Sequence, residues 1–358
     1  MLYILIAILM FGILIALHEF GHFAAAKLCG VKVNEFAIGM GPQVIHKKGK
    51  ETDYSFRLFP IGGFCAMEGE EEGKSNDPRA FPNRPWWQRL IILLAGVFMN
   101  FLTGLVIILL LFSQAKSFVA PVVTGYLSGA EDLAAEGLLL GDRLYRVDGH
   151  RIYTNSDALL FLGRAGETVD LEVVRDGTHV TMDDFSMPVR TLTDENGETV
   201  QKRGIRIGVE EEAAVGLRLK NAWYQAIDYV RLVWISLGDL ITGAVGVRDM
   251  SGPVGIVDMV GQVGEAGAAA GGFIGAFLSI LEFVAFISIN LSVMNLLPIP
   301  ALDGGQILFM AVNGIYTAFT RKKLNPQYLG YVSAAGFACL MLFMAAVTVS
   351  DILKKFGV

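Results

Sequence analysis

The chain has 358 residues, of which 53% are hydrophobic and only 18% are charged, a balance far from that of an average soluble protein. Its formal net charge of −6 excludes a generally basic surface, so nucleic acid is not an expected partner. Three scattered cysteines, Cys29, Cys65 and Cys339, make neither a disulfide framework nor a thiolate metal site. The composition predicts a membrane protein in which any metal ion is held by nitrogen and oxygen.

The first apolar stretch, residues 1–17, leads directly into the sequence His18-Glu19-Phe20-Gly21-His22. On a helix, histidines at i and i+4 share one face and can bind a single zinc ion, with the neighbouring glutamate as general base. Ionisable groups are costly inside a bilayer and are functional by default. We therefore predict that His18 and His22 bind zinc and that Glu19 is the catalytic base.

Two other interpretations of this segment are a cleaved signal peptide and a pair of histidines without metal. A cleaved signal peptide would need a charged beginning and an apolar core of roughly 7–15 residues, whereas no Lys or Arg precedes Lys27 and the core is longer. A pair of helix histidines without metal remains open, although two histidines and an acid in lipid would then need other partners.

Four apolar stretches are long enough to cross a hydrocarbon core of about 30 Å: residues 2–28, 90–112, 273–316 and 328–349. The third is too long for one span and contains Pro298 and Pro300, which predict a broken helix. Irregular backbone at membrane depth is tolerated only where it is buried in protein or lines a water-filled cavity. We expect the active site to use this break.

The short loops predict the orientation. Lys and Arg gather in residues 31–89 and again at 321–323, so both segments should be cytoplasmic. The N-terminus, the long insert after residue 112 and the C-terminus are then outside, although Lys354 and Lys355 disagree. His18 falls in the cytoplasmic half of the membrane.

The insert, residues 117–209, has soluble character, with alternating runs at 170–174 and 204–209 that predict strands. Residues 136–149, EGLLLGDRLYRVDG, resemble the central signature of a PDZ domain. Another small β-rich module is the alternative.

A catalytic zinc ion usually takes three protein ligands and leaves a fourth position for water. Asp303 directly follows the proline break and is our candidate for the third ligand. Glu282 competes, but it lies toward the outer end of the same stretch.

Taken together, HEFGH, LPIPALDGG at 297–305, SGPVGI at 251–256 and the single insert resemble the bacterial site-2 protease family, of the regulator-of-sigma-E protease type. The resemblance implies a zinc-dependent intramembrane endopeptidase of the bacterial inner membrane that cuts single-span membrane proteins, such as anti-sigma factors and signal-peptide remnants. It assigns His18, His22 and Asp303 as ligands and Glu19 as base, and Asn295 as a substrate contact. Some members carry two PDZ domains, and this chain has room for one.

We thus expect an α-helical polytopic membrane protein with about four transmembrane helices and an inserted extracytoplasmic PDZ-like α+β domain. The expected parts are residues 1–116 with two spans and a β-rich loop, 117–209 as the PDZ-like domain, 210–272 as an extracytoplasmic amphipathic region, and 273–358 with two further spans. Residues 53–59 alternate like a strand, which could pair with an unwound substrate or belong to a plain hairpin. A zinc transporter or a PDZ scaffold that cuts nothing is the alternative function.

Overall fold

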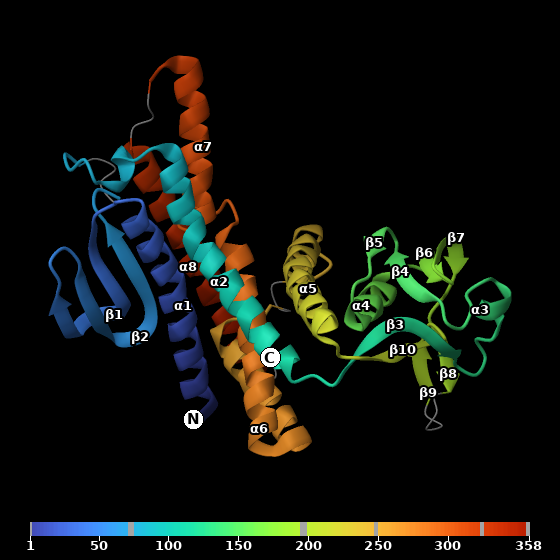
Figure 1. Ribbon diagram of the computed structural model, residues 1–358. Coiled ribbons are helices and arrows are strands. Elements are labelled where there is room, and N and C mark those ends of the chain that lie inside the picture. The colour runs from blue at the N-terminus through green and yellow to red at the C-terminus, as the bar shows by residue number, and fades with distance from the viewer. Residues whose placement is uncertain (1, 71–74, 194–198, 247–249, 323–325, 356–358) are drawn as a thin grey trace. The chain divides into compact units, whose positions relative to one another are not determined.

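The computed structural model describes residues 2–70, 75–193, 199–246, 250–322 and 326–355. The chain divides into two compact units (Figure 1). Unit 1 comprises Met1–Ile108 and Tyr229–Val358, and unit 2 comprises Leu109–Asp228. Unit 2 is wider than the insert that we expected at 117–209, because it also holds the end of one long helix and the beginning of another.

Among the described residues, four helices are long and apolar enough to span a membrane. They are α1 (Leu2–Leu28), α2 (Trp86–Ser113), α6 (Pro253–Asn295) and α8 (Pro326–Lys355). At a rise of about 1.5 Å per residue, each exceeds the roughly 30 Å of a hydrocarbon core. A polytopic membrane protein was therefore predicted correctly.

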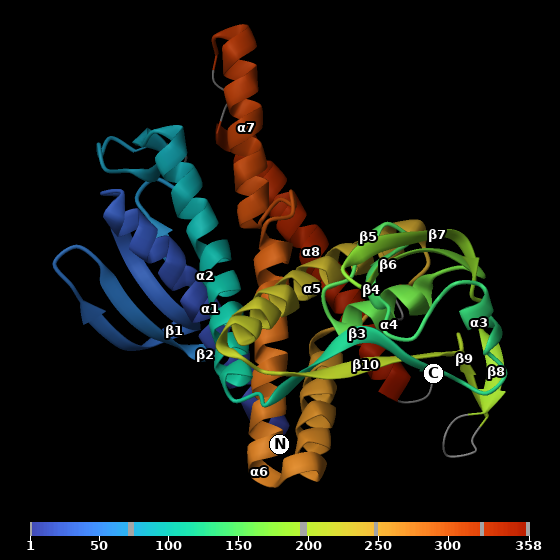
Figure 2. The ribbon, with the colours of Figure 1, turned by 45° about the vertical axis from the view of Figure 1, so that its right-hand side comes forward.

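Helix α6 folds back on itself. Gly271 and Gly272 have non-helical backbone, and Gly272 lies in the left-handed region at φ 62°, which glycine adopts at little cost. A Cβ on Gly275 would lie 2.2 Å from the carbonyl oxygen of Gly267, so the two arms touch through their backbones (Figure 2). The helix begins at Pro253, before the third apolar stretch that we placed at 273–316, and its first arm packs through Val260 against α1.

After α6 the chain breaks over residues 296–302 and begins again as α7 (Asp303–Thr320). A Cβ on Gly304 would meet the carbonyl oxygens of Leu296 and Leu297 at 2.2 and 2.3 Å, and one on Gly305 would meet the oxygen of Ile299 at 2.3 Å. Only glycine fits here. The two glycines therefore let the start of α7 sit directly on the break, and this fixes the position of Asp303.

Small residues bring α1, α2 and α6 together. Cβ atoms on Gly21 and Gly104 would meet the oxygens of Ala95 and Ala285 at 2.4 and 2.9 Å. Across the α2–α6 contact, Ser288 donates to the carbonyl oxygen of Asn100 at 2.7 Å and Ser292 to that of Val97 at 2.9 Å. Such bonds between membrane helices contribute about 0.6 kcal/mol each. These bonds fix the position of α2 along the axis of α6.

Strands β1 (Val33–Lys48) and β2 (Asp53–Met67) form an antiparallel sheet beside α1 (Figure 1). Both strands bend, as the pairing shows: Ile38 of β1 pairs with two separate parts of β2, at Phe56 and at Gly63. Residues 53–56 consequently have β1 neighbours on both sides, since Phe56 also pairs with Ile45. Of the two alternatives given for residues 53–59, pairing with a substrate is therefore wrong for this paired part. Residues 63–67 pair with β1 on one side only.

Unit 2 is built on a mixed α+β plan. Its main sheet has the strand order β10-β3-β4-β6-β7, with β5 paired to β4. The sheet strands are β3 (Ser117–Tyr126), β4 (Arg143–Val147), β5 (His150–Arg151), β6 (Thr168–Arg175), β7 (Thr178–Ser186) and β10 (Ile205–Glu212). A separate hairpin joins β8 (Arg190–Thr193) and β9 (Thr199–Lys202). The expected strands at 170–174 and 204–209 are confirmed as β6 and β10.

Three helices complete this unit: α3 (Asp132–Ala135), α4 (Asn155–Arg164) and the first part of α5 (Val215–Thr242). Unit 1 also contains the short 3-10 helix η1 (Phe81–Asn83). The PDZ-like segment 136–149 forms the turn into β4. Its Asp142 is fully buried, and Arg175 of β6 holds both carboxylate oxygens at 2.7 Å.

We expect Arg175→Ala to destabilise unit 2 by about 3 kcal/mol, because it leaves a buried carboxylate without its counter-ion. Hydrogen exchange at the amides of β4 and β6 measures the local opening free energy. Arg146→Ala is the matched control, since its pair with Glu172 leaves the arginine side chain 50% exposed and such pairs contribute at most about 1 kcal/mol. Equal exchange in the two variants would contradict this prediction.

Candidate metal centre

Three side chains from two distant parts of the chain meet in unit 1. His18 and His22 lie one turn apart on α1, and Asp303 is the first residue of α7. The Nε2 atoms of the histidines are 3.1 Å apart, and each lies 3.3 Å from Oδ2 of Asp303. Both histidines are buried, with 8% and 7% of their surface exposed. Within the described residues these are the His, Cys, Asp and Glu side chains grouped closely enough to hold a metal ion.

The geometry fits zinc. Ligand atoms about 2.1 Å from a tetrahedral ion lie about 3.4 Å from one another, and the three measured separations of 3.1 to 3.3 Å match one face of such a tetrahedron. Oδ2 of Asp303 is buried and faces the two histidine nitrogens at 3.3 Å without a well-formed hydrogen bond. A buried carboxylate oxygen without a good donor is costly, and a cation at this point removes the cost.

His22 is prepared for metal binding by its second nitrogen. Nδ1 lies 2.8 Å from the carbonyl oxygen of Ile92 on α2. Because a carbonyl oxygen can only accept a hydrogen bond, Nδ1 has to be the donor. With the proton on Nδ1, neutral His22 presents the lone pair of Nε2 to the site. The contact between α1 and α2 thus sets the tautomer of one ligand.

Glu19 lies between the two histidines in sequence and beside β2 in space. A Cβ on Gly63 would lie 3.5 Å from Cγ of Glu19, and the backbone of Cys65 hydrogen-bonds to its carboxylate, so β2 runs past this carboxylate. The side chain is partly exposed. Strand β2 and Glu19 therefore lie together beside the candidate metal position.

A family model decides how this site is classified: peptidase family M50, the site-2 proteases, matches residues 6–343. The chain belongs to this family. It is 35% identical to a protein of Clostridium acetobutylicum that is named as a zinc metalloprotease, over 98% of this chain and 97% of the relative. A zinc metalloprotease of Clostridium perfringens is 36% identical over 98% and 99%. The regulator of sigma-W protease RasP of Bacillus subtilis is 28% identical over 98% of each chain.

This M50 peptidase is therefore a membrane zinc metalloprotease. The alternatives of a zinc transporter and of a scaffold that cuts nothing are excluded by the same finding. Of the other predicted residues, Asn295 ends α6 with its amide nitrogen 3.5 Å from Nε2 of His18, so it borders the site. Glu282 is not part of the grouped ligands.

Two polar residues near the site were missed by the sequence analysis. Asn100, an amide within the apolar run of α2, has its nitrogen 3.2 Å from Nδ1 of His18. Glu70 follows β2 and hydrogen-bonds to Gln306 of α7, and desolvation raises the pKa of its carboxyl to about 7. The position of Asn100 inside a span was the available signal. For Glu70 there was none, because an acidic run in a loop is usually solvated.

We expect Gly96→Ala to abolish zinc binding. A Cβ there would lie 2.3 Å from Nε2 of His22 and 2.8 Å from Cε1 of His18, so one ligand has to leave its position. Metal analysis of the purified variant measures the loss.

Gly104→Ala is the control for crowding of α2 against α6. Its Cβ would lie 2.6 Å from Cγ1 of Ile289 and cost about 1–3 kcal/mol by overpacking, but it is not in contact with a ligand. If Gly96→Ala retains as much zinc as Gly104→Ala, the described approach of α2 to the histidines is wrong.

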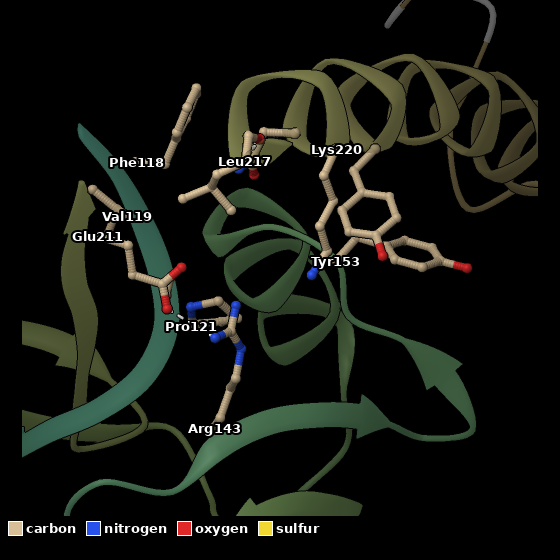
Figure 3. Close-up of a pocket in the computed structure, with 11 residues that line it drawn as sticks. Phe118, Val119, Pro121, Arg143, Tyr153, Glu211, Leu217 and Lys220 are labelled. Atoms are coloured by element: carbon tan, nitrogen blue, oxygen red, sulfur yellow. Dashed lines mark hydrogen bonds and ion pairs between the residues drawn. The ribbon is translucent and has the colours of Figure 1, made fainter. Parts of the chain in front are cut away.

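Unit 2 has a small surface hollow of different character (Figure 3). Phe118 and Pro121 of β3 line it together with Tyr153, Leu217 and Lys220, and an ion pair of 2.8 Å joins Arg143 to Glu211 at its side. Lys220 leaves the lining with one excess positive charge, and the described residues of the hollow include no grouped metal ligands. We assign the chemistry to unit 1.

Proposed function

We propose that this protein is an intramembrane endopeptidase that cuts the transmembrane segments of single-span membrane proteins, among them anti-sigma factors and signal-peptide remnants. His18, His22 and Asp303 hold the zinc ion, Glu19 is the catalytic base and Asn295 contacts the substrate. The observation that carries the proposal is the tetrahedral face formed by three ligand atoms, two from the candidate membrane span α1 and one from the start of α7. The name of RasP, a regulator of sigma-W protease, supports the anti-sigma substrates.

A zinc ion held by His18, His22 and Asp303 would supply Lewis acidity, which would lower the pKa of a bound water toward about 7 and polarise the scissile carbonyl. Glu19 removes the proton from the water and later delivers it to the leaving amine. Asn295 lies beside His18, where its amide can donate to a carbonyl oxygen of the substrate. Each role belongs to one side chain, so each can be removed separately.

The substrate has to be unwound before it is cut, because a transmembrane helix hides its peptide bonds in i to i+4 hydrogen bonds. Residues 63–67 of β2 have one unpaired side and pass Glu19. An extended substrate that adds to this edge presents its backbone to the base. The edge thus takes the place of residues 53–59 as the proposed docking strand.

The charged loops support an orientation in which the β1–β2 sheet is cytoplasmic and the N-terminus and unit 2 are extracytoplasmic, in the bacterial inner membrane. We further propose that unit 2 is a PDZ-like domain, on the basis of the segment 136–149 and of the α+β plan around it. In this orientation it would meet the extracytoplasmic part of a substrate. It controls access and takes no part in the chemistry.

The proposal is tested by cleavage of a model single-span substrate by the purified protein, compared with the Glu19→Gln variant. Absence of cleavage by the zinc-loaded parent, with substrates that differ in their transmembrane sequence, would contradict it.

We expect deletion of residues 117–212 to leave the activity toward a short single-span substrate and to relax the discrimination against a substrate that retains a folded outer domain. The two ends of the deletion lie side by side, since Ser117 and Glu212 are paired at the ends of β3 and β10. A short Gly/Ser linker can therefore join them. Cleavage rates for the matched substrates are the measurement. If a zinc-loaded deletion variant discriminates as strongly as the parent, unit 2 has no gating role.

A further inference from the structure

Asn100 faces the nitrogen of His18 that points away from the metal position. It is 1% exposed and lies in the middle of α2. Its amide nitrogen is 3.2 Å from Nδ1 of His18, and its oxygen Oδ1 is buried without a hydrogen-bond partner among the described residues. A buried amide oxygen without a partner costs about 1–3 kcal/mol. The arrangement therefore needs a physical explanation.

The explanation lies in the tautomer of His18. A neutral imidazole that binds metal through Nε2 carries its proton on Nδ1, as His22 does opposite the oxygen of Ile92. The same tautomer of His18 would direct an N–H at the NH₂ group of Asn100, so two donors would meet. The present orientation of the amide suits a histidine whose Nδ1 accepts, and that histidine has no lone pair on Nε2 for a metal ion.

Rotation of the amide by 180° gives Oδ1 a partner and removes the meeting of two donors. It places Oδ1 opposite Nδ1, where the oxygen accepts the proton of the metal-binding tautomer, and it exchanges two groups of nearly equal shape. The backbone stays fixed, because Ser288 donates to the carbonyl oxygen of Asn100 at 2.7 Å. Only the end of one side chain has to turn.

We propose that Asn100 is a positioning residue that fixes His18 in the Nδ1–H tautomer, with its amide oxygen turned toward His18 in the zinc-loaded protein. The inference rests on the proposed zinc site. Hydrogen-bond partners of ligating histidines typically contribute 10–100-fold to metal affinity. Because Asn100 is only 1% exposed, we expect its effect on cleavage to follow from its effect on His18.

Two variants of similar size separate the acceptor from the packing. Asn100→Leu removes the acceptor, and Asn100→Asp keeps an acceptor of the same shape that cannot donate to Nδ1. Zinc affinity is measured on the full-length protein in detergent by competition with a chromophoric chelator, and the ¹⁵N shifts of labelled histidine report the tautomer of His18. We expect about 10–100-fold weaker zinc binding and loss of the Nδ1–H signal in Asn100→Leu, and parental behaviour in Asn100→Asp.

Ser288→Ala is the packing control. It removes the bond to the backbone of Asn100 but leaves the amide, and we expect zinc affinity within about twofold of the parent, since such a bond contributes only about 0.6 kcal/mol. Parental zinc affinity in Asn100→Leu, or equal losses in all three variants, would overturn the inference. If Asn100→Leu does not fold, weak zinc binding by Asn100→Asp alone overturns it. Failure of the parent itself to bind zinc would instead refute the proposed function.

Discussion

Replacement of Glu19 by Gln is expected to abolish proteolysis while zinc stays bound. The amide has nearly the shape of the carboxylate but cannot take a proton from water, and the loss of a general base costs at least about 10²-fold in rate. The three ligand atoms belong to other residues, so the metal site is untouched. The measurements are the rate of cleavage of a single-span substrate and the zinc content of the same preparation.

The matched control is Glu282→Gln, the same chemical change at another acid in the spanning helix α6. Since Glu282 lies outside the ligand group, this variant should cut at the parental rate. Near-normal cleavage by Glu19→Gln, in detergent or in cells, would refute the assigned base.

The second large effect is expected for Asp303→Ala, which should lower the zinc content and the activity together. Oδ2 of Asp303 supplies one corner of the ligand face, 3.3 Å from each histidine nitrogen. An incomplete ligand set loses both affinity and geometry, so the zinc content should fall well below the roughly one ion per chain of a complete site. Metal analysis and cleavage are again measured on one preparation.

Glu282→Ala serves as the control, because it also removes one carboxylate from the same sequence stretch that we first considered for the third ligand. It should retain its zinc. Unchanged zinc in Asp303→Ala would move the third ligand to another residue, and Glu70, whose carboxyl interacts electrostatically with His22, would be the next candidate.

The residues of the metal centre were accessible from sequence because their chemistry is conspicuous in an apolar background. His18 and His22 stand at helical spacing inside a span, and Asp303 follows the two prolines that break the third stretch. The helical spacing and the free-energy cost of polar groups in a membrane together leave few candidate metal ligands. The distances between these groups were not accessible, since they depend on how Gly304 and Gly305 seat α7 on the break.

The hairpin of α6 could not be predicted for a different reason. Residues 264–275, rich in glycine and alanine, look flexible by composition, yet in membrane helices small residues serve close packing. Here Gly267 and Gly275 allow the two arms of α6 to pack closely. Composition alone does not distinguish a linker from a tight helix contact.

The strand pairing in the sheet beside α1 is a third feature that could not be predicted from sequence. Alternation identified residues 53–59 as a strand, but it says nothing about which neighbours pair with that strand. The bends that place Phe56 between Ile38 and Ile45 depend on glycines such as Gly39 and Gly41, which have positive φ. Pairing is a property of the whole sheet, so the free edge became evident only in three dimensions.

The order of the ligands along the chain has a consequence during biosynthesis. His18 and His22 are made first, and Asp303 follows about 280 residues later, many seconds later at a synthesis rate of about 5–20 residues per second. Throughout that interval the nascent protein has two histidines but not the carboxylate that completes the ligand face. If Asp303 is the third ligand, a chain that ends before it lacks a complete zinc site, and we expect it to have no proteolytic activity. Zinc would then be acquired only after α7 has been made and has packed onto the break.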